Sequence, residues 1–218
     1  MSEVVVVYSG GLDSTVMLYD LVDRDFDVVH ALSFNYGQSH VKELSYAKEH
    51  CDSLRIPLSC IDLKLPYLGV PLIDGEGIPD GYYTDESMKQ TIVPNRNAIM
   101  LSIAYGVAVN LHADLVAIAA HSGDHPIYPD CRVAFMDCIE KAFQLGTDQQ
   151  VKIFTPYVSV DKTEIVRVGN KIGVEFEKTW SCYKGMGVHC GKCGTCTERR
   201  EAFTLAEVFD PTTYEEEL

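Results

Sequence analysis

The segment Ser9-Gly10-Gly11-Leu12-Asp13-Ser14 combines the residue types that bind an anion. Its two glycines allow a tight turn and a close approach of the backbone to a ligand. Ser9 and Ser14 add hydroxyl donors, and the N–H groups at the start of a following helix attract negative charge. The segment lacks the lysine of a Walker loop and the third glycine of a dinucleotide-binding loop. It predicts a phosphate site of another kind, with an ordinary capped turn as the alternative.

A cysteine cluster is the second motif with chemistry of its own. C-x2-C spacing lets two thiolates bind one Zn²⁺ at about 2.3 Å, and small residues between them suit tight turns. Disulfides at this spacing would be strained. Four protein ligands leave no open position, so the pattern predicts a structural zinc site; an iron–sulfur cluster and a redox pair are the alternatives. The four cysteines, spaced C-x7-C-x2-C-x2-C, are Cys182, Cys190, Cys193 and Cys196.

Two basic residues stand where helices are expected to begin. Arg96 directly precedes an apolar helix at 98–110, and Lys162 lies in the first turn of a helix at 161–172. A cation at this end opposes the positive end of the helix dipole, so a bound phosphate or carboxylate would compensate it. A surface salt bridge for Arg96 and a solvated side chain for Lys162 are the alternatives.

A polar loop extends from residue 121 to residue 132. It follows a predicted strand directly, and a loop at the carboxyl end of a parallel strand is a common ligand-binding position. We therefore predict a binding loop; a hydrogen-bonded surface loop or a metal site is the alternative. Its polar residues are His121, Ser122, Asp124, His125, Tyr128, Asp130 and Arg132.

Strands and helices that alternate along the chain must position these motifs. Strands are expected at 4–7, 27–34, 58–63, 115–120 and 151–155. One helix is expected to begin at residue 13, and others are expected at 40–54, 98–110, 134–145 and 161–172, with a short one at 198–203. This alternation predicts an α/β fold with a doubly wound parallel sheet. The phosphate-type loop and the turn at 35–38 both follow strands, so we expect them to face one crevice.

The sequence divides into an α/β domain, residues 1–178, and a zinc-binding segment, residues 179–218, packed on it. Between residues 66 and 90, prolines and glycines interrupt any long regular element. A loop of this length inside a compact domain is commonly an active-site lid. We therefore expect residues 66–90 to be a lid over the crevice.

Composition narrows the class of protein. The chain has 218 residues and a formal net charge of −14, from 32 acidic and 18 basic residues. Nucleic-acid binding is supplied by Lys and Arg, so a broad nucleic-acid surface is disfavoured. No apolar run approaches the ~20 residues of a membrane span, and the first residues do not resemble a signal peptide. We therefore expect a cytoplasmic protein that uses its cysteines as thiols or metal ligands.

The phosphate-type loop resembles that of the N-type ATP pyrophosphatase superfamily. The wider pattern is similar, over residues 3 to 204, to the QueC family of 7-cyano-7-deazaguanine synthases in queuosine-precursor biosynthesis. Asn95 departs from it, since many members have Gly there, and the loop from His121 to Ile127 varies in the family. The motifs that carry the resemblance are Ser9 to Ser14, Phe34 to Gln38 with His40 and Glu43, Val93-Pro94 with Arg96-Asn97, Tyr128 to Arg132, and Thr179 to Tyr183 with the three later cysteines.

The resemblance implies an ATP-dependent C–N ligase with a fold like the adenine-nucleotide alpha-hydrolases, a Rossmann-like fold. Its substrates would be ATP, ammonia and 7-carboxy-7-deazaguanine, and its product the 7-nitrile, preQ0. ATP would activate the carboxylate, ammonia would give an amide, and a second activation would give the nitrile. The implied metals are Mg²⁺ and Zn²⁺, and the implied assembly is a homodimer.

The resemblance also implies roles for individual residues. The backbone of Gly10 to Asp13, with Ser9, Leu12 and Ser14, would hold the phosphates, and Asp13 would orient Mg²⁺. Arg96 and Lys162 would neutralise charge at the α-phosphate. From the position of its loop, Asp130 is expected to read the guanine-like edge, because a carboxylate accepts from two donors at once. The full expected substrate set is Tyr36, Gln38, His40, Tyr128, Asp130 and Arg132.

Three other functions stay open from sequence. A tRNA-modifying member of the superfamily would need a basic RNA surface, which a net charge of −14 argues against. A zinc-ribbon interaction module would have no use for an intact phosphate loop. A relative that joins the deazaguanine carboxylate to another amine would carry the same activation motifs, and only the choice of amine would distinguish it.

Overall fold

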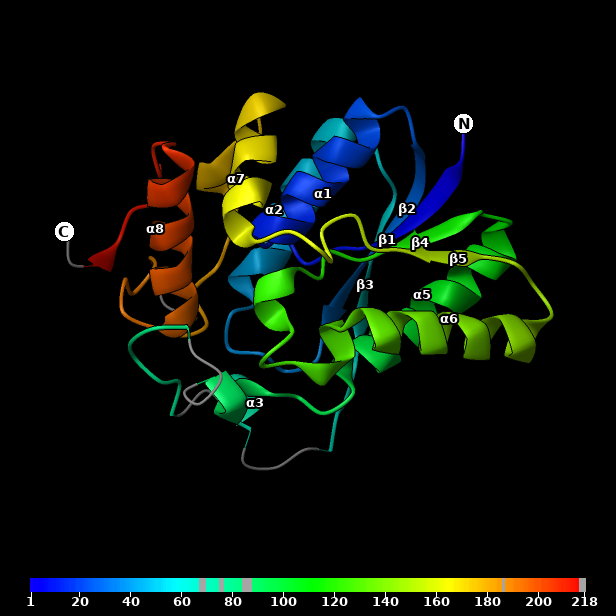
Figure 1. Ribbon diagram of the computed structural model, residues 1–218, viewed down its shortest axis with the longest axis horizontal. Coiled ribbons are helices and arrows are strands. Elements are labelled where there is room, and N and C mark those ends of the chain that lie inside the picture. The colour runs from blue at the N-terminus through cyan, green and yellow to red at the C-terminus, as the bar shows by residue number, and fades with distance from the viewer. Residues whose placement is uncertain (67–69, 75–76, 84–87, 186, 216–218) are drawn as a thin grey trace.

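Five parallel strands form one sheet in the order β3-β2-β1-β4-β5 (Figure 1). The structure is a computed structural model, and it describes residues 1–66, 70–74, 77–83, 88–185 and 187–215. The strands are β1 Glu3–Val7, β2 Asp27–Asn35, β3 Leu58–Asp62, β4 Leu115–Ala117 and β5 Lys152–Phe154. The strand order reverses between β1 and β4, which confirms the doubly wound parallel sheet expected from sequence.

Helices cover both faces of this sheet. On one face lie α1 Leu12–Asp23, α2 Lys42–Leu54, α7 Lys162–Lys171 and α8 Gly194–Ala206, and on the other lie α5 Arg96–Leu111 and α6 Val133–Thr147 (Figure 1). The valine run of β1 supplies both cores, because alternate side chains of a strand point to opposite faces. Val4 and Val6 pack beneath α1, whereas Val5 packs toward α5.

The structure differs from the sequence-based expectations mainly in length. The expected strand at 115–120 ends at Ala117, so residues 118–121 are free to line the crevice beyond it. The short helix expected at 198–203 is instead the 13-residue helix α8, and it begins inside the cysteine motif. Its Arg199 is fully buried and donates to Asp210 Oδ1 at 3.3 Å and Thr179 Oγ1 at 2.8 Å.

The lid expected at residues 66–90 is described only in part. Residues 67–69, 75–76 and 84–87 lie outside the described residues. The described part holds a single short α-helix, α3 Pro71–Asp74, and a 3-10 turn begins at Lys89. Asp80 bridges to Cys193, and Gly81 N donates to the carbonyl of Lys192 at 2.8 Å. This segment is therefore joined to the cysteine segment. No helix in the described part of the chain is long and apolar enough to cross a membrane.

Candidate active site and metal centre

The phosphate-type loop lies between the end of β1 and the start of α1. Its hydroxyls bond within the loop: Ser9 Oγ lies 3.1 Å from Ser14 Oγ and accepts from Gly11 N at 3.1 Å. Ser14 Oγ also accepts from Ser9 N at 3.3 Å. These bonds hold the loop in a fixed turn at the positive end of α1, where the helix dipole favours an anion.

Gly10 shows why this turn needs glycine. Its φ is +84°, a left-handed conformation that side chains rarely adopt. A Cβ at this position would lie 2.1 Å from the carbonyl oxygen of Glu43 and 2.7 Å from Ala47 N, both in α2. The carbonyl of Gly10 accepts from Trp180 N at 3.2 Å. Gly10 therefore joins β1 to both α2 and the cysteine segment.

A cavity of about 210 Å³ opens at the carboxyl ends of β1 and β4. It receives side chains from β2, α2, α5, the loop after β4, α7 and the cysteine segment. One crevice therefore joins residues as far apart in sequence as Val7 and Thr195. Ten of the predicted site residues line it: Ser9, Gly11, Leu12, Asp13, Ser14, Tyr36, His40, Arg96, Tyr128 and Lys162.

Besides the four cysteines, four predicted site residues do not line the cavity: Gly10, Gln38, Asp130 and Arg132. Gln38 is buried and braces the turn after β2, accepting from Tyr36 N at 2.8 Å and donating to the carbonyl of Phe34 at 3.0 Å. Asp130 Oδ2 accepts from Asn97 N at 2.9 Å in the first turn of α5. Arg132 is exposed and donates to the carbonyl of His125 at 2.8 Å.

Lys162 is held between two carboxylates. Its Nζ lies 2.5 Å from Glu198 Oε2 and 3.3 Å from Asp13 Oδ2. Burial lowers the pKa of Lys162, but the attraction of Asp13 and Glu198 outweighs it and raises the pKa above the ordinary value. His121 lies on the other side of Glu198, with 3.9 Å between Nε2 and Oε1. Lys162 is therefore a permanent cation beside the phosphate-type loop.

Arg96 lies on the opposite wall of the cavity. It donates to Tyr36 Oη at 3.3 Å and its guanidinium lies 5.8 Å from the centre of the Tyr36 ring. In the described residues, no carboxylate lies within ion-pair distance of Arg96. No carboxylate of the described residues therefore neutralises the positive charge at the start of α5, and contact of Arg96 with a bound anion stays a prediction.

Glu43 and His40 form a buried pair that also lines the cavity. Glu43 Oε1 accepts from Gln38 Nε2 at 3.3 Å and lies 3.4 Å from His40 Nε2. Burial raises the pKa of Glu43 to about 8, although Gln38, Arg96 and Ser9 act in the opposite direction. Burial and Arg96 lower the pKa of His40 to about 3, so its imidazole is neutral at pH 7.

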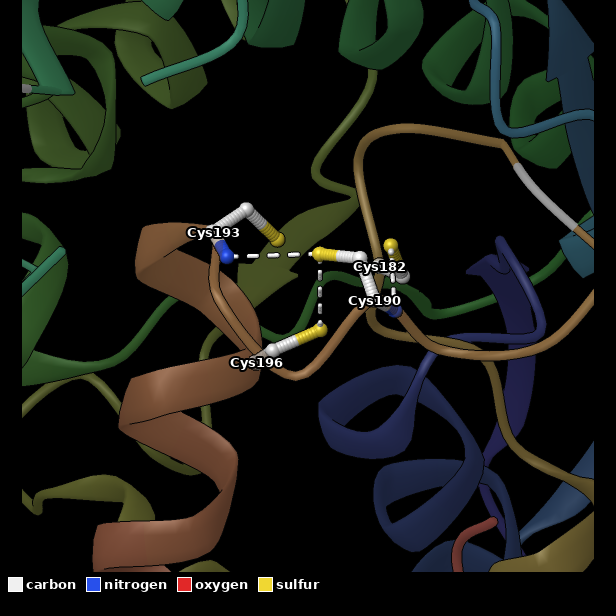
Figure 2. Close-up of side chains that lie close together, drawn as sticks. All are labelled: Cys182, Cys190, Cys193 and Cys196. Carbon is white, nitrogen blue, oxygen red and sulfur yellow. Dashed lines mark hydrogen bonds between the residues drawn. The ribbon is translucent and has the colours of Figure 1, made fainter. Parts of the chain in front are cut away.

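The four motif cysteines converge on one point, as Figure 2 shows. All four are buried, and their Sγ atoms lie within 4.8 Å of one another. The Sγ atoms of Cys190 and Cys196 are 3.9 Å apart, close to the about 3.8 Å that a tetrahedral Zn²⁺ with 2.3 Å bonds requires. Backbone N–H groups of Lys192 and Cys193 point at Cys190 Sγ at 3.4 and 3.3 Å. The donor set fits a closed tetrahedral metal site.

Three side chains at this site had no assigned role from sequence, although Tyr183 was expected near the crevice. Glu198 was placed on a short helix with no role, because nothing in sequence shows that this helix faces Lys162. Tyr183 lines the cavity and stacks on His40, with 5.1 Å between ring centres. Tyr83 also lines it and donates to Asp124 Oδ1 at 2.9 Å. Tyr183 follows a metal ligand directly, and that proximity was the available signal.

The sheet order, the glycine-rich loop after β1 and the cavity at the switch point define a doubly wound α/β fold with a ligand cavity at the carboxyl ends of its strands. A solved U34-tRNA thiolase from Methanococcus maripaludis has the same fold, with a TM-score of 0.52 and 18% identity over 100% of this chain and 75% of that one. At this identity the similarity concerns the fold alone.

The chain belongs to the QueC family: the family model described as "Queuosine biosynthesis protein QueC" matches residues 3–207. Two relatives are similar to it over nearly their whole length. The 7-cyano-7-deazaguanine synthase from Caldicellulosiruptor saccharolyticus is 46% identical over 98% of this chain and 96% of its own. The 7-cyano-7-deazaguanine synthase from Allorhizobium ampelinum is 50% identical over 98% of this chain and 93% of its own. Family membership confirms the resemblance read from the motifs.

Proposed function

We propose that this protein is an ATP-dependent C–N ligase that converts 7-carboxy-7-deazaguanine and ammonia into 7-cyano-7-deazaguanine. The observation that carries the proposal is a family match over residues 3–207 in a chain whose phosphate-type loop opens into a cavity with buried cations. The relatives named as 7-cyano-7-deazaguanine synthases support the same reaction.

The chemistry needs activation before nitrogen can attack. A carboxylate repels nucleophiles and has no good leaving group, so one of its oxygens first attacks a phosphorus of ATP, and the P–O bond to the departing part of ATP breaks. Ammonia then displaces the phosphate-bearing oxygen to give an amide, and a second activation of the amide oxygen lets it leave as the nitrile forms. Phosphorus chemistry of this kind depends on positioning and electrostatics, so no covalent protein nucleophile is required.

The two cations act from opposite walls in this proposal. Lys162, fixed by Asp13 and Glu198, faces the phosphates held at the loop of Ser9 to Ser14. Arg96 faces the substrate carboxylate and the α-phosphate to which it is joined. Charge that develops on these oxygens is then stabilised by donors that are already in place, which lowers the barrier without reorganisation.

The deazaguanine ring is proposed to lie among the aromatic side chains. Tyr36, Tyr128 and Tyr183 line the cavity beside Arg96, and their rings offer stacking surfaces. His40 and the amide of Asn97 supply polar contacts from the same wall. Gln38, Asp130 and Arg132 are proposed to support the residues that line the cavity without contacting the substrate. Asp130, for example, accepts a hydrogen bond from Asn97 N and so fixes the start of the helix that carries Arg96.

Each proposed metal has a fitting set of donors. Asp13 Oδ1 is buried with no hydrogen-bond partner among the described residues, which fits an oxygen ligand of Mg²⁺. Bound Mg²⁺ would neutralise phosphate charge. Zn²⁺ at the four cysteines would hold the segment from residue 179 onward against the cavity, where Trp180 and Tyr183 contribute. We also propose a cytoplasmic homodimer that uses small-molecule substrates and binds no nucleic acid.

A mass-spectrometric end-point assay tests the function. Purified protein is incubated with ATP, Mg²⁺, ammonium and 7-carboxy-7-deazaguanine, and all products are identified. We expect the nitrile, with AMP or ADP formed only when the carboxylate is present; the nucleotide found decides which phosphate bond is broken. ATP consumption without nitrile would instead indicate another amine as the acceptor. No ATP consumption by the zinc-loaded protein would contradict the proposal.

A further inference from the structure

Glu43 occupies the boundary between the two halves of the proposed active site. It lines the cavity from the first turn of α2. Its Oε2 lies 3.9 Å from the position that a Cβ of Gly11 would occupy, so it is next to the phosphate-type loop. Arg96, on the other side, is close enough to act on its charge. A carboxylate held between the phosphate loop and Arg96 would lie beside Glu43.

Glu43 also differs from the other carboxylates that line the cavity in the described part of the chain, Asp13 and Asp124. Asp13 is paired with Lys162 at 3.3 Å. Asp124 accepts from Tyr83 Oη at 2.9 Å and lies 3.6 Å from His121 Nε2. The ion-pair contact of Glu43 is with His40, which is uncharged at pH 7. Of the three, only Asp13 is paired with a lysine, and Glu43 is distinguished from Asp124 by its place next to the phosphate-type loop.

His40, which contacts Glu43, is poorly suited to accept a proton. Burial lowers the pKa of His40 to about 3, which makes it a weak base. The other histidine of the cavity, His121, faces Asp13 and Asp124 with its Nε2 at 4.0 and 3.6 Å. A buried carboxylate without a cation is complementary to a small cation such as ammonium, and near pH 8 about half of the Glu43 side chains are ionised.

We propose that Glu43 is the proton acceptor that converts bound ammonium into the ammonia nucleophile. The inference rests on the proposed function. Ammonium transfers one proton to the Glu43 carboxylate, which gives free ammonia and a neutral carboxyl group. The nitrogen lone pair then forms the C–N bond to the activated carbonyl carbon, and the C–O bond to phosphate breaks with its electron pair. The proton lost from the attacking nitrogen leaves with the departing phosphate or to water.

Proton affinity supports this assignment. Burial raises the pKa of Glu43 to about 8, and a general base is most effective when its pKa is near the working pH. The titratable and charged groups that face it are His40 from the turn before α2, Tyr36 from the end of β2 and Arg96 from α5. Because His40 is neutral, Arg96 is the charged group that opposes the rise in the pKa of Glu43.

The choice of nucleophile gives a direct test. Hydroxylamine has a much more acidic conjugate acid than ammonia, so at pH 8 it is already a free base and needs no proton acceptor. Wild type, Glu43→Gln and the exposed control Glu201→Gln are assayed with ATP, Mg²⁺ and 7-carboxy-7-deazaguanine. Each protein receives either ammonium or hydroxylamine. Mass spectrometry measures the sum of amide and nitrile in the ammonium reactions and the hydroxamate in the hydroxylamine reactions.

We expect Glu43→Gln to lose at least about 100-fold in turnover with ammonium, the usual scale of acid–base catalysis. Its hydroxamate formation should stay within about three-fold of wild type, which also shows that the variant is folded and activates the carboxylate. Unchanged turnover of Glu43→Gln with ammonium, or an equal loss with both nucleophiles, overturns the role of Glu43 and leaves the proposed function intact. A wild type that forms neither amide, nitrile nor hydroxamate overturns the proposed function, and this inference with it.

Discussion

The backbone carbonyl of Gly10, in the phosphate-type loop, accepts a hydrogen bond from the backbone N–H of Trp180 at 3.2 Å. Trp180 in turn donates from its indole Nε1 to the carbonyl of the metal ligand Cys182 at 2.7 Å. Two hydrogen bonds thus connect the proposed ATP site to the cysteine cluster. The cysteine cluster and the phosphate-type loop are adjacent parts of one structure.

Loss of the metal should therefore affect both stability and nucleotide binding. In Cys193→Ser, the site keeps three thiolates, and we expect zinc content to fall together with a loss of at least about 3 kcal/mol, or about 10 °C in Tm. Weaker ATP binding, measured by calorimetry, should accompany it. Cys138→Ser, at an exposed cysteine outside the cluster, is the control. Metal loss with unchanged Tm would exclude a structural role.

Lys162 should be needed for activation of the carboxylate. Lys162→Met removes the cation and leaves Asp13 and Glu198 without it, so we expect carboxylate-dependent ATP consumption to fall about 10²–10³-fold. The matched control is Lys48→Met, because Lys48 forms an exposed pair with Asp52 and such pairs contribute less than about 1 kcal/mol. Normal ATP consumption by Lys162→Met would argue that this lysine only stabilises the fold.

Arg96 should select for the anionic substrate. In Arg96→Gln, the cavity loses the cation that has no carboxylate partner in the described residues, so we expect a KM increase of at least about ten-fold for the carboxylate. Arg167→Gln changes an exposed arginine paired with Glu164 and should leave KM unchanged. Steady-state kinetics at saturating ATP measures both. An unchanged KM and kcat in Arg96→Gln would remove Arg96 from the site.

Gly10 should tolerate no side chain. A Cβ at this position would lie 2.1 Å from the backbone of α2, and the backbone here has a positive φ that alanine rarely adopts. Gly10→Ala should therefore lower the free energy of unfolding by at least about 3 kcal/mol. Gly106 is exposed in α5 with no atom within 4 Å of a built Cβ. Gly106→Ala should therefore raise stability by up to about 1 kcal/mol. Urea unfolding of both variants checks the contrast, and equal effects would contradict it.

Glu43 should make stability depend on pH. Its pKa is about 8 in the folded protein and near 4.5 in the unfolded chain, so between these values the folded state binds more protons. Stability therefore falls as pH rises through this window. From pH 6 to pH 8 the loss from this group is about 2 kcal/mol. In Glu43→Gln, the difference in stability between the two pH values should shrink by that amount, measured by urea unfolding.

Much of the fold could be predicted from sequence because the local signals agree with the tertiary structure. The valine run of β1 and the nearly all-apolar α5 are both buried elements, and their residue types show it. The cysteine spacing likewise predicts convergence, since C-x2-C holds two thiols close before any tertiary contact forms. These features depend on short stretches of chain.

The contacts between distant segments could not be predicted in the same way. The ion pair of Lys162 with Glu198 requires α7 and α8 to pack side by side, and no local pattern encodes that pairing. Asp130 lies in a 3-10 turn, where a shift of one residue decides whether the carboxylate faces a ligand or the start of α5. Sequence placed Asp130 in the correct loop, but the direction of its side chain depends on the tertiary structure.

The position of α8 has a consequence for how this protein is made. Cys196 and Glu198 lie in the first two turns of the same helix, so one late segment carries both a metal ligand and the partner of Lys162. A nascent chain that has left the ribosome only as far as Phe176 contains all five strands of the sheet and the phosphate-type loop. It still lacks the four cluster cysteines and the second carboxylate of the Lys162 pair. The ion pairs of Lys162 and the cavity beside them can therefore be completed only after this last segment has been synthesised.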